Sequence, residues 1–270
     1  MIRHAAVLVA LALPAAAAPP EQEALFEALA VERTVALMHA ESVAQGEEVA
    51  EDLFPGRGLA GWRSSLDRIY DEGAMRQRLE EAMSDALAGE DVAAMTGFFS
   101  SETGARIVKL ELSAREALSD EDVEEAARAA WSLLPEEDPE RASRIQRFVA
   151  VNDLVAENVE AALNANLGFL RGLQDGGAFP EAMPEDEMLA QVWSTEGEVR
   201  AEMEDWLGTH FALAYEPLSD AELDAYIDFS ASEAGQALNR ALFAGFDAMY
   251  DGIGRELGRA AAAQMVGFDL

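Results

Sequence analysis

The pattern Phe-x-x-Ser-Glu-x-Gly occurs twice in the chain, and each occurrence places a hydroxyl group beside a carboxylate. In order, the residues of the two copies are Phe98, Ser101, Glu102 and Gly104, then Phe229, Ser232, Glu233 and Gly235. A serine acts as a nucleophile only where a base lies within hydrogen-bonding reach. Apart from His4, the chain has two histidines, His39 and His210, which stand at unrelated places relative to the two copies. The pattern therefore argues against nucleophilic catalysis.

A helix start explains the same residues without any catalysis. A Ser directly before a helix accepts a hydrogen bond from an otherwise unpaired backbone N–H, which stabilises the helix by about 1 kcal/mol. The Glu that follows is favoured by the positive end of the helix dipole. Glycine inside a helix costs about 1 kcal/mol relative to alanine, so we expect Gly104 and Gly235 to allow the close approach of another helix.

A second repeated pattern places a carboxylate four residues before an arginine. Glu72-Gly-Ala-Met-Arg76 matches Glu196-Gly-Glu-Val-Arg200. On a helix, such a pair contributes a few tenths of a kcal/mol when it is exposed to solvent. The sequence leaves two alternatives beside that one: a partly buried ion pair between the repeats, or arginines presented to an anionic ligand.

Other acidic runs are interpreted as solvated helix starts. The runs are 120–122, 136–138 and 185–187, and none has the alternating ligands and central Gly of a calcium loop. The two histidines lack the spacing of a zinc site, and no phosphate-binding glycine loop is present. We therefore expect no cofactor. Glycoside hydrolysis needs two carboxylates, and a chain with 52 Asp and Glu residues leaves that alternative open.

Charge and cysteine content exclude several classes of protein. The formal net charge is -33 at pH 7, which repels phosphate backbones and argues against nucleic-acid binding. Cationic partners are compatible with such a surface. The chain has no cysteine, so it forms no disulfide and uses no thiol chemistry.

The first residues have the features of a secretory signal peptide. Arg3 precedes an apolar run, Pro14 breaks it, and a series of alanines follows. We expect a signal peptide over residues 1–18 that is cleaved near Ala17, and a periplasmic location in a Gram-negative bacterium. The apolar run is shorter than the roughly 20 residues of a membrane span, and we expect no transmembrane segment in the mature chain.

Apolar residues recur at helical spacing along the rest of the chain, and alternating β-branched runs are almost absent. The sequence predicts an all-α fold with about ten helices. The expected long helices cover 21–45, the stretch from Pro139 to about 173, and 233–265, the last being a long amphipathic C-terminal helix. Shorter helices are expected at 61–70, 72–87, 91–99 and 102–118, and Ser119 with the acids after it marks another helix start.

Self-comparison predicts a tandem duplication. Besides the two repeated patterns above, Ala30-Val-Glu-Arg-Thr-Val-Ala36 is similar to Ala150-Val-Asn-Asp-Leu-Val-Ala156. The three similarities occur in the same order in both halves. We therefore expect a helical repeat over 19–135 and a second over 136–270.

The second half resembles a known family. In the bacterial exported family called domain of unknown function 2059, a short helix ends in Phe-Tyr and the next begins Ser-Pro-x-Gly. The segment from Phe229 to Leu238 is similar, with Ser230 at the Tyr position and Glu233 at the Pro position. The resemblance covers about 195–265 and, more weakly, the corresponding part of the first half. It implies an all-helical, exported protein and no particular activity.

These observations favour a non-catalytic periplasmic binding or interaction protein. Its partner would be another envelope protein or a cationic peptide. The alternative is a hydrolase that uses paired carboxylates in a cleft between the two repeats. A cleft holding two carboxylates would favour the enzyme, and a fully packed junction would favour the binding protein.

Overall fold

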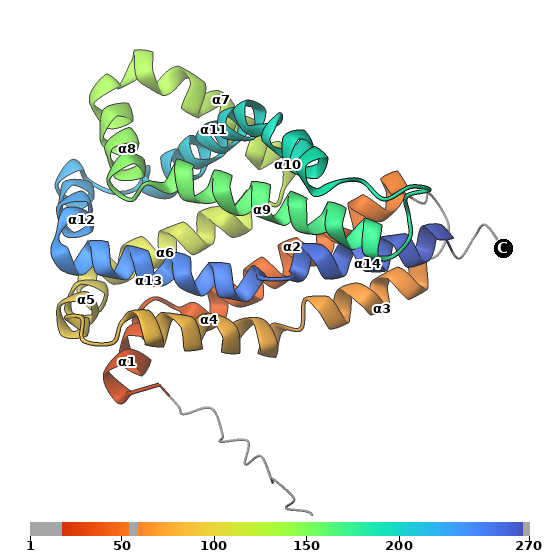
Figure 1. Ribbon diagram of the computed structural model, residues 1–270. Coiled ribbons are helices and arrows are strands. Elements are labelled where there is room, and N and C mark those ends of the chain that lie inside the picture. The colour runs from red at the N-terminus through yellow and green to blue at the C-terminus, as the bar shows by residue number, and fades with distance from the viewer. Residues whose placement is uncertain (1–17, 54–58, 267–270) are drawn as a thin grey trace, which may run out of the picture.

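The computed structural model describes residues 18–53 and 59–266, which form fourteen α-helices and no strand (Figure 1). The all-α prediction is confirmed, with more helices than expected. The helices are α1 (Pro20–Ala28), α2 (Val31–Leu53), α3 (Leu59–Ile69), α4 (Glu72–Ala86), α5 (Val92–Phe99), α6 (Glu102–Ala117), α7 (Glu121–Glu137), α8 (Pro139–Val151), α9 (Leu154–Asp175), α10 (Glu185–Trp193), α11 (Glu196–Tyr215), α12 (Asp220–Ala231), α13 (Glu233–Tyr250) and α14 (Ile253–Val266). The predicted cleavage site near Ala17 lies outside the described residues.

Each of the three helices predicted to be long is divided in two, so these predictions were wrong. The divisions fall at Ala30, at Asp153 and at Gly252, whose φ angles are 51°, 51° and 75°. A single residue in the left-handed region ends a helix, because its backbone cannot continue the right-handed spiral. Only Gly252 belongs to the residue type that favours such a φ angle.

The main hydrophobic core crosses the predicted repeat boundary. It includes Leu25 and Leu79 from the first half and Leu223 and Leu238 from the second, each at most 2 % exposed. A smaller cluster lies between α9 and α10, around Met188. The two halves therefore share one core.

The halves are also interleaved. Helix α13 of the second half lies along α4 of the first, and α6 of the first half packs on α11 of the second (Figure 1). Within the first half α1 packs on α5, and within the second half α8 packs on α12. None of the described helices is long and apolar enough to cross a membrane.

Helices α9 and α14 approach each other backbone to backbone. A Cβ atom on Gly172 would lie 2.2 Å from the carbonyl oxygen of Arg255, and one on Gly258 would lie 2.2 Å from that of Phe169. At one end of this contact the Asp175 carboxylate accepts hydrogen bonds from Arg255 and Arg259, which lower its pKa to about 2. This contact holds α14 against α9.

Candidate functional site

The two Ser-Glu-x-Gly copies have the same local geometry. Ser101 Oγ accepts a hydrogen bond from Gly104 N at 3.1 Å and donates one to Phe98 O at 2.6 Å. Ser232 Oγ has the equivalent bonds, at 3.1 Å to Gly235 N and 2.6 Å to the carbonyl of the preceding motif Phe. Both hydroxyl protons are thus directed at backbone carbonyls, and the serines serve as helix caps.

Both motif glycines stand where no side chain fits. A Cβ on Gly104 would lie 2.2 Å from Phe98 O, and one on Gly235 would lie 2.0 Å from Phe229 O. The helix that approaches each glycine is therefore the one just before the turn, α5 or α12, rather than one from elsewhere in the fold. Glu102 and Glu233 occupy the first turns of α6 and α13.

The two copies meet through their aromatic residues. The rings of Phe98 and Phe229 stack with centroids 4.2 Å apart and planes 10° from parallel. Phe99 packs edge-on against Phe229, and Tyr226 extends the cluster. The repeated motif is therefore a packed junction between the two halves.

The repeated Glu and Arg residues behave differently in the two halves. Arg200 pairs with Glu196 at 2.7 Å, whereas Arg76 lies 3.9 Å from Glu80 and 4.0 Å from Glu32. The expected contact of Arg76 with Glu72 is not among the ion pairs of the described residues. The side chains of Arg76 and Arg200 are 46 % and 41 % exposed, so neither forms a buried ion pair between the repeats.

Glu72 and Arg76 instead line a groove between α1, α2 and α4, which we call the α1–α2–α4 groove. Its volume is about 820 Å³. The apolar residues that line it come from α1, from the start of α2 and from the residues next to these helices: Ala18, Phe26, Ala30, Val31 and Ala36. The charged residues around it are Glu23, Glu27, Glu32, Glu72, Glu80, Arg33 and Arg76.

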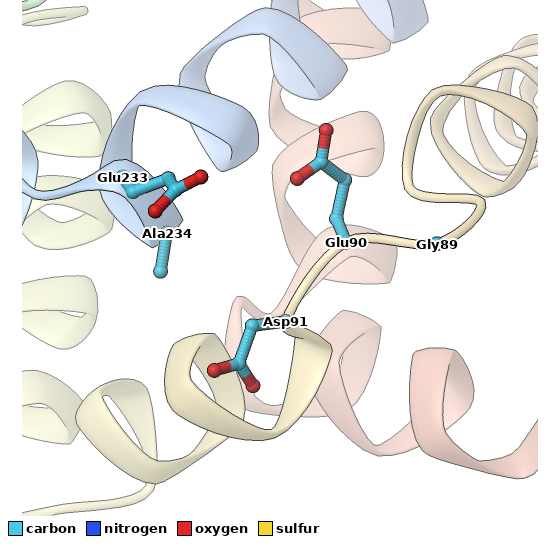
Figure 2. A pocket seen from close by; sticks show the side chains of 5 residues that line it. All are labelled: Gly89, Glu90, Asp91, Glu233 and Ala234. Carbon is cyan, nitrogen blue, oxygen red and sulfur yellow. The ribbon is translucent and has the colours of Figure 1, made fainter.

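A smaller depression of about 260 Å³ lies where the first turns of α5 and α13 meet, and we call it the acidic pocket (Figure 2). Glu90, Asp91 and Glu233 line it. Asp91 caps α5 by accepting a hydrogen bond from a backbone N–H, and Glu90 lies 3.7 Å from Arg240. Among the described residues no group of three or more His, Asp or Glu side chains could hold a metal ion.

Glu111, which no sequence pattern indicated as a site, is a carboxyl group held between α6, α11 and α12. Tyr215 Oη donates a hydrogen bond to it at 2.6 Å, and Tyr226 also bonds to it. Burial raises the pKa of Glu111 to about 7, although these hydrogen bonds favour the ionised form. The sequence offered one signal: Glu111 follows Ile107 by four residues and therefore falls on the apolar face of its helix.

His210, on α11, is a buried ionisable residue that is 6 % exposed. Burial, together with the positive charge of Arg115, lowers its pKa to about 4. Its ring stacks on Trp206 at 5.3 Å, and its Nδ1 atom has no hydrogen-bond partner among the described residues. The histidine is neutral at pH 7 and lies next to Thr209, whose Oγ1 atom also lacks a partner among the described residues.

No family model matches the sequence, and comparisons with curated proteins and with solved structures find no significant match. The resemblance to domain of unknown function 2059 therefore stays a prediction.

Proposed function

We propose that the protein is an exported, non-catalytic binding protein that takes up a segment of another envelope protein in the α1–α2–α4 groove. The groove itself is the observation that carries this proposal. Its volume of about 820 Å³ is within the size range of ligand sites. Phe26 and Val31, which are 7 % and 5 % exposed, form the floor of the groove, and the charged side chains around it can fix the orientation of a partner.

The proposal includes the tandem duplication as the origin of the scaffold. The equal hydrogen bonds of the two Ser caps support it, as do the matched packings of α13 on α4 and α6 on α11. Ala30 and Asp153 are the two described non-glycine residues with positive φ, and each stands between corresponding helices. This geometry supports Asp153, rather than Ala150, as the counterpart of Ala30 in the proposed duplication.

Export to the periplasm rests on the signal-like sequence of the first residues. The hydrolase alternative has less support. The acidic pocket does bring carboxylates together between the halves, but Asp91 is used as a helix cap and Glu90 lies beside Arg240. A glycosidase needs one carboxyl group free to donate a proton and another free to attack or to activate water.

Site-specific crosslinking in intact cells tests the proposed function. A photoreactive amino acid replaces Ala36 or Glu72 in the groove, and Leu133, which is 51 % exposed on α7, serves as the control position. We expect both groove positions to crosslink to the same segment of one envelope protein, mapped by mass spectrometry, and the control to give no such product. Equal crosslinking from Leu133, or none from the groove, would contradict the proposal.

A further inference from the structure

We infer that the segment bound by the α1–α2–α4 groove is cationic, with an apolar side chain that enters the groove and basic side chains that reach its acidic rim. This inference rests on the function proposed above and names the class of partner. It rests on a comparison of the carboxylates around the groove that form ion pairs within the protein with those that do not.

The two arginines at the groove are engaged by acids. Arg33 forms an ion pair of 2.8 Å with Glu116, which lies outside the groove. Arg76 lies between Glu32 and Glu80, at 4.0 and 3.9 Å. These contacts account for both positive charges that line the groove.

Three carboxylates remain without an ion pair among the described residues: Glu23, Glu27 and Glu72. Glu23 and Glu27 are four residues apart on α1 and therefore share one face of that helix. Glu72 begins α4, which supplies another wall of the groove. The apolar residues Phe26 and Val31 line the same groove. A segment with one apolar anchor flanked by Arg or Lys complements this arrangement.

Glu27 is the most informative of the three acids. It stands one residue before the end of α1, where the negative end of the helix dipole makes a carboxylate unfavourable. Glu72, by contrast, lies in the first turn of α4, where the dipole stabilises it. A cation bound beside Glu27 would offset this unfavourable position.

A second copy of this chain is a poor occupant. Each copy carries a formal net charge of -33, so two copies repel each other strongly. A cationic segment is instead attracted over a distance of about one Debye length, which is roughly 8 Å at physiological ionic strength.

Fluorescence anisotropy with three synthetic peptides tests the inference on the purified mature protein. The peptides share a helical sequence with one Leu stripe and differ in three flanking positions, which are Arg, Gln or Glu. We expect the Arg peptide to bind at least tenfold more tightly than the Gln peptide at physiological salt, and the Glu peptide not to bind. The triple variant Glu23→Gln/Glu27→Gln/Glu72→Gln should lose about tenfold in affinity for the Arg peptide.

A matched control separates recognition at the groove from attraction to the whole acidic surface. It makes the same change of charge at exposed acids that do not line the groove: Glu102→Gln, Glu121→Gln and Glu187→Gln. This control should bind the Arg peptide as the wild type does. The single variant Glu27→Gln should raise the melting temperature of the free protein while it weakens peptide binding.

The possible outcomes separate this inference from the proposed function. Equal binding of the Arg and Gln peptides would overturn the cationic partner but leave a peptide groove. Equal losses in the groove and control triple variants would show attraction to bulk charge and would also overturn the inference. Self-association of the wild type, abolished in the groove variant and measured by light scattering, would assign the groove to a second copy. Failure of every peptide to bind would refute both proposals.

Discussion

Glu111 and His210 should give the stability of the protein two opposite dependences on pH. Glu111→Gln removes the titrating carboxyl group but keeps an oxygen that can accept the hydrogen bond from Tyr215. His210→Phe removes the titrating ring nitrogens and keeps an aromatic ring that can stack on Trp206. Each variant thus removes one titration with little change in packing.

The sign of each effect follows from the direction of the pKa shift. The pKa of Glu111 is raised from 4.5 to about 7, so the folded state holds that proton more tightly than the unfolded chain. Its contribution to the free energy of unfolding is fully present below pH 4.5 and is lost as pH rises to 7. The pKa of His210 is lowered from 6.5 to about 4, so the unfolded chain binds that proton more tightly. Its contribution is present above pH 6.5 and is lost as pH falls to 4.

The two effects have similar size. One pKa unit corresponds to about 1.4 kcal/mol, so each shift changes the free energy of unfolding by about 3 kcal/mol across its range. Between pH 4.5 and 6.5 the two slopes oppose each other and nearly cancel in the wild type. Glu111→Gln should therefore reveal a free energy of unfolding that rises with pH, and His210→Phe one that falls.

Urea unfolding followed by tryptophan fluorescence at pH 4.5, 5.5, 6.5 and 7.5 measures these slopes. The difference between variant and wild type removes the contributions of other groups, such as Asp175, whose pKa of about 2 lies outside this range. Glu102→Gln, an exposed change on the same helix as Glu111, serves as the control and should leave the curve unchanged in shape. A difference curve for Glu111→Gln that is flat from pH 4.5 to 7.5 would refute the reasoning.

Two further predictions concern the backbone. Gly235→Ala should lower the free energy of unfolding by about 1 to 3 kcal/mol, because its Cβ would lie 2.0 Å from Phe229 O. At Gly97 the new Cβ would have no atom within 4 Å, so Gly97→Ala should instead raise the free energy of unfolding by up to about 1 kcal/mol. Equal melting temperatures of the two variants in calorimetry would contradict this contrast. Ala30→Gly should raise the free energy of unfolding by about 1 kcal/mol, because glycine relieves the strain of the positive φ of 51°. The control Ala24→Gly, inside α1, should lower the free energy of unfolding. If urea unfolding shows a loss of stability in both variants, Ala30 is not strained.

Local rules predicted those parts of the fold that depend on neighbours in sequence. Ser101 and Ser232 cap their helices as a Ser before Glu predicts. The breaks at Ala30 and Asp153 escaped prediction because neither residue is one that favours a left-handed backbone as glycine does.

The contacts of Glu111 could not be predicted either, because they join residues that are distant in sequence. Glu111 meets Tyr215 and Tyr226, which come from the other half of the chain, so no local pattern connects them. The repeated Glu-Gly-x-Met/Val-Arg pattern suggested equal roles for both copies. The structure gives Arg200 its expected partner but places Arg76 between Glu80 of its own helix and Glu32 of α2, which packs on α4.

An unpaired carboxylate carries little information by itself in this protein. With 52 acidic residues against 19 Lys and Arg, most acids necessarily lack a basic partner. Glu27 differs from most of the solvent-exposed acids in a combination of features. It lies at the C-terminal end of α1, which disfavours negative charge, and it lines the groove together with Phe26 and Val31. The two arginines of that groove already contact other acids. The acidic composition is compatible with a cationic partner, and the proposed site for such a partner is this one groove.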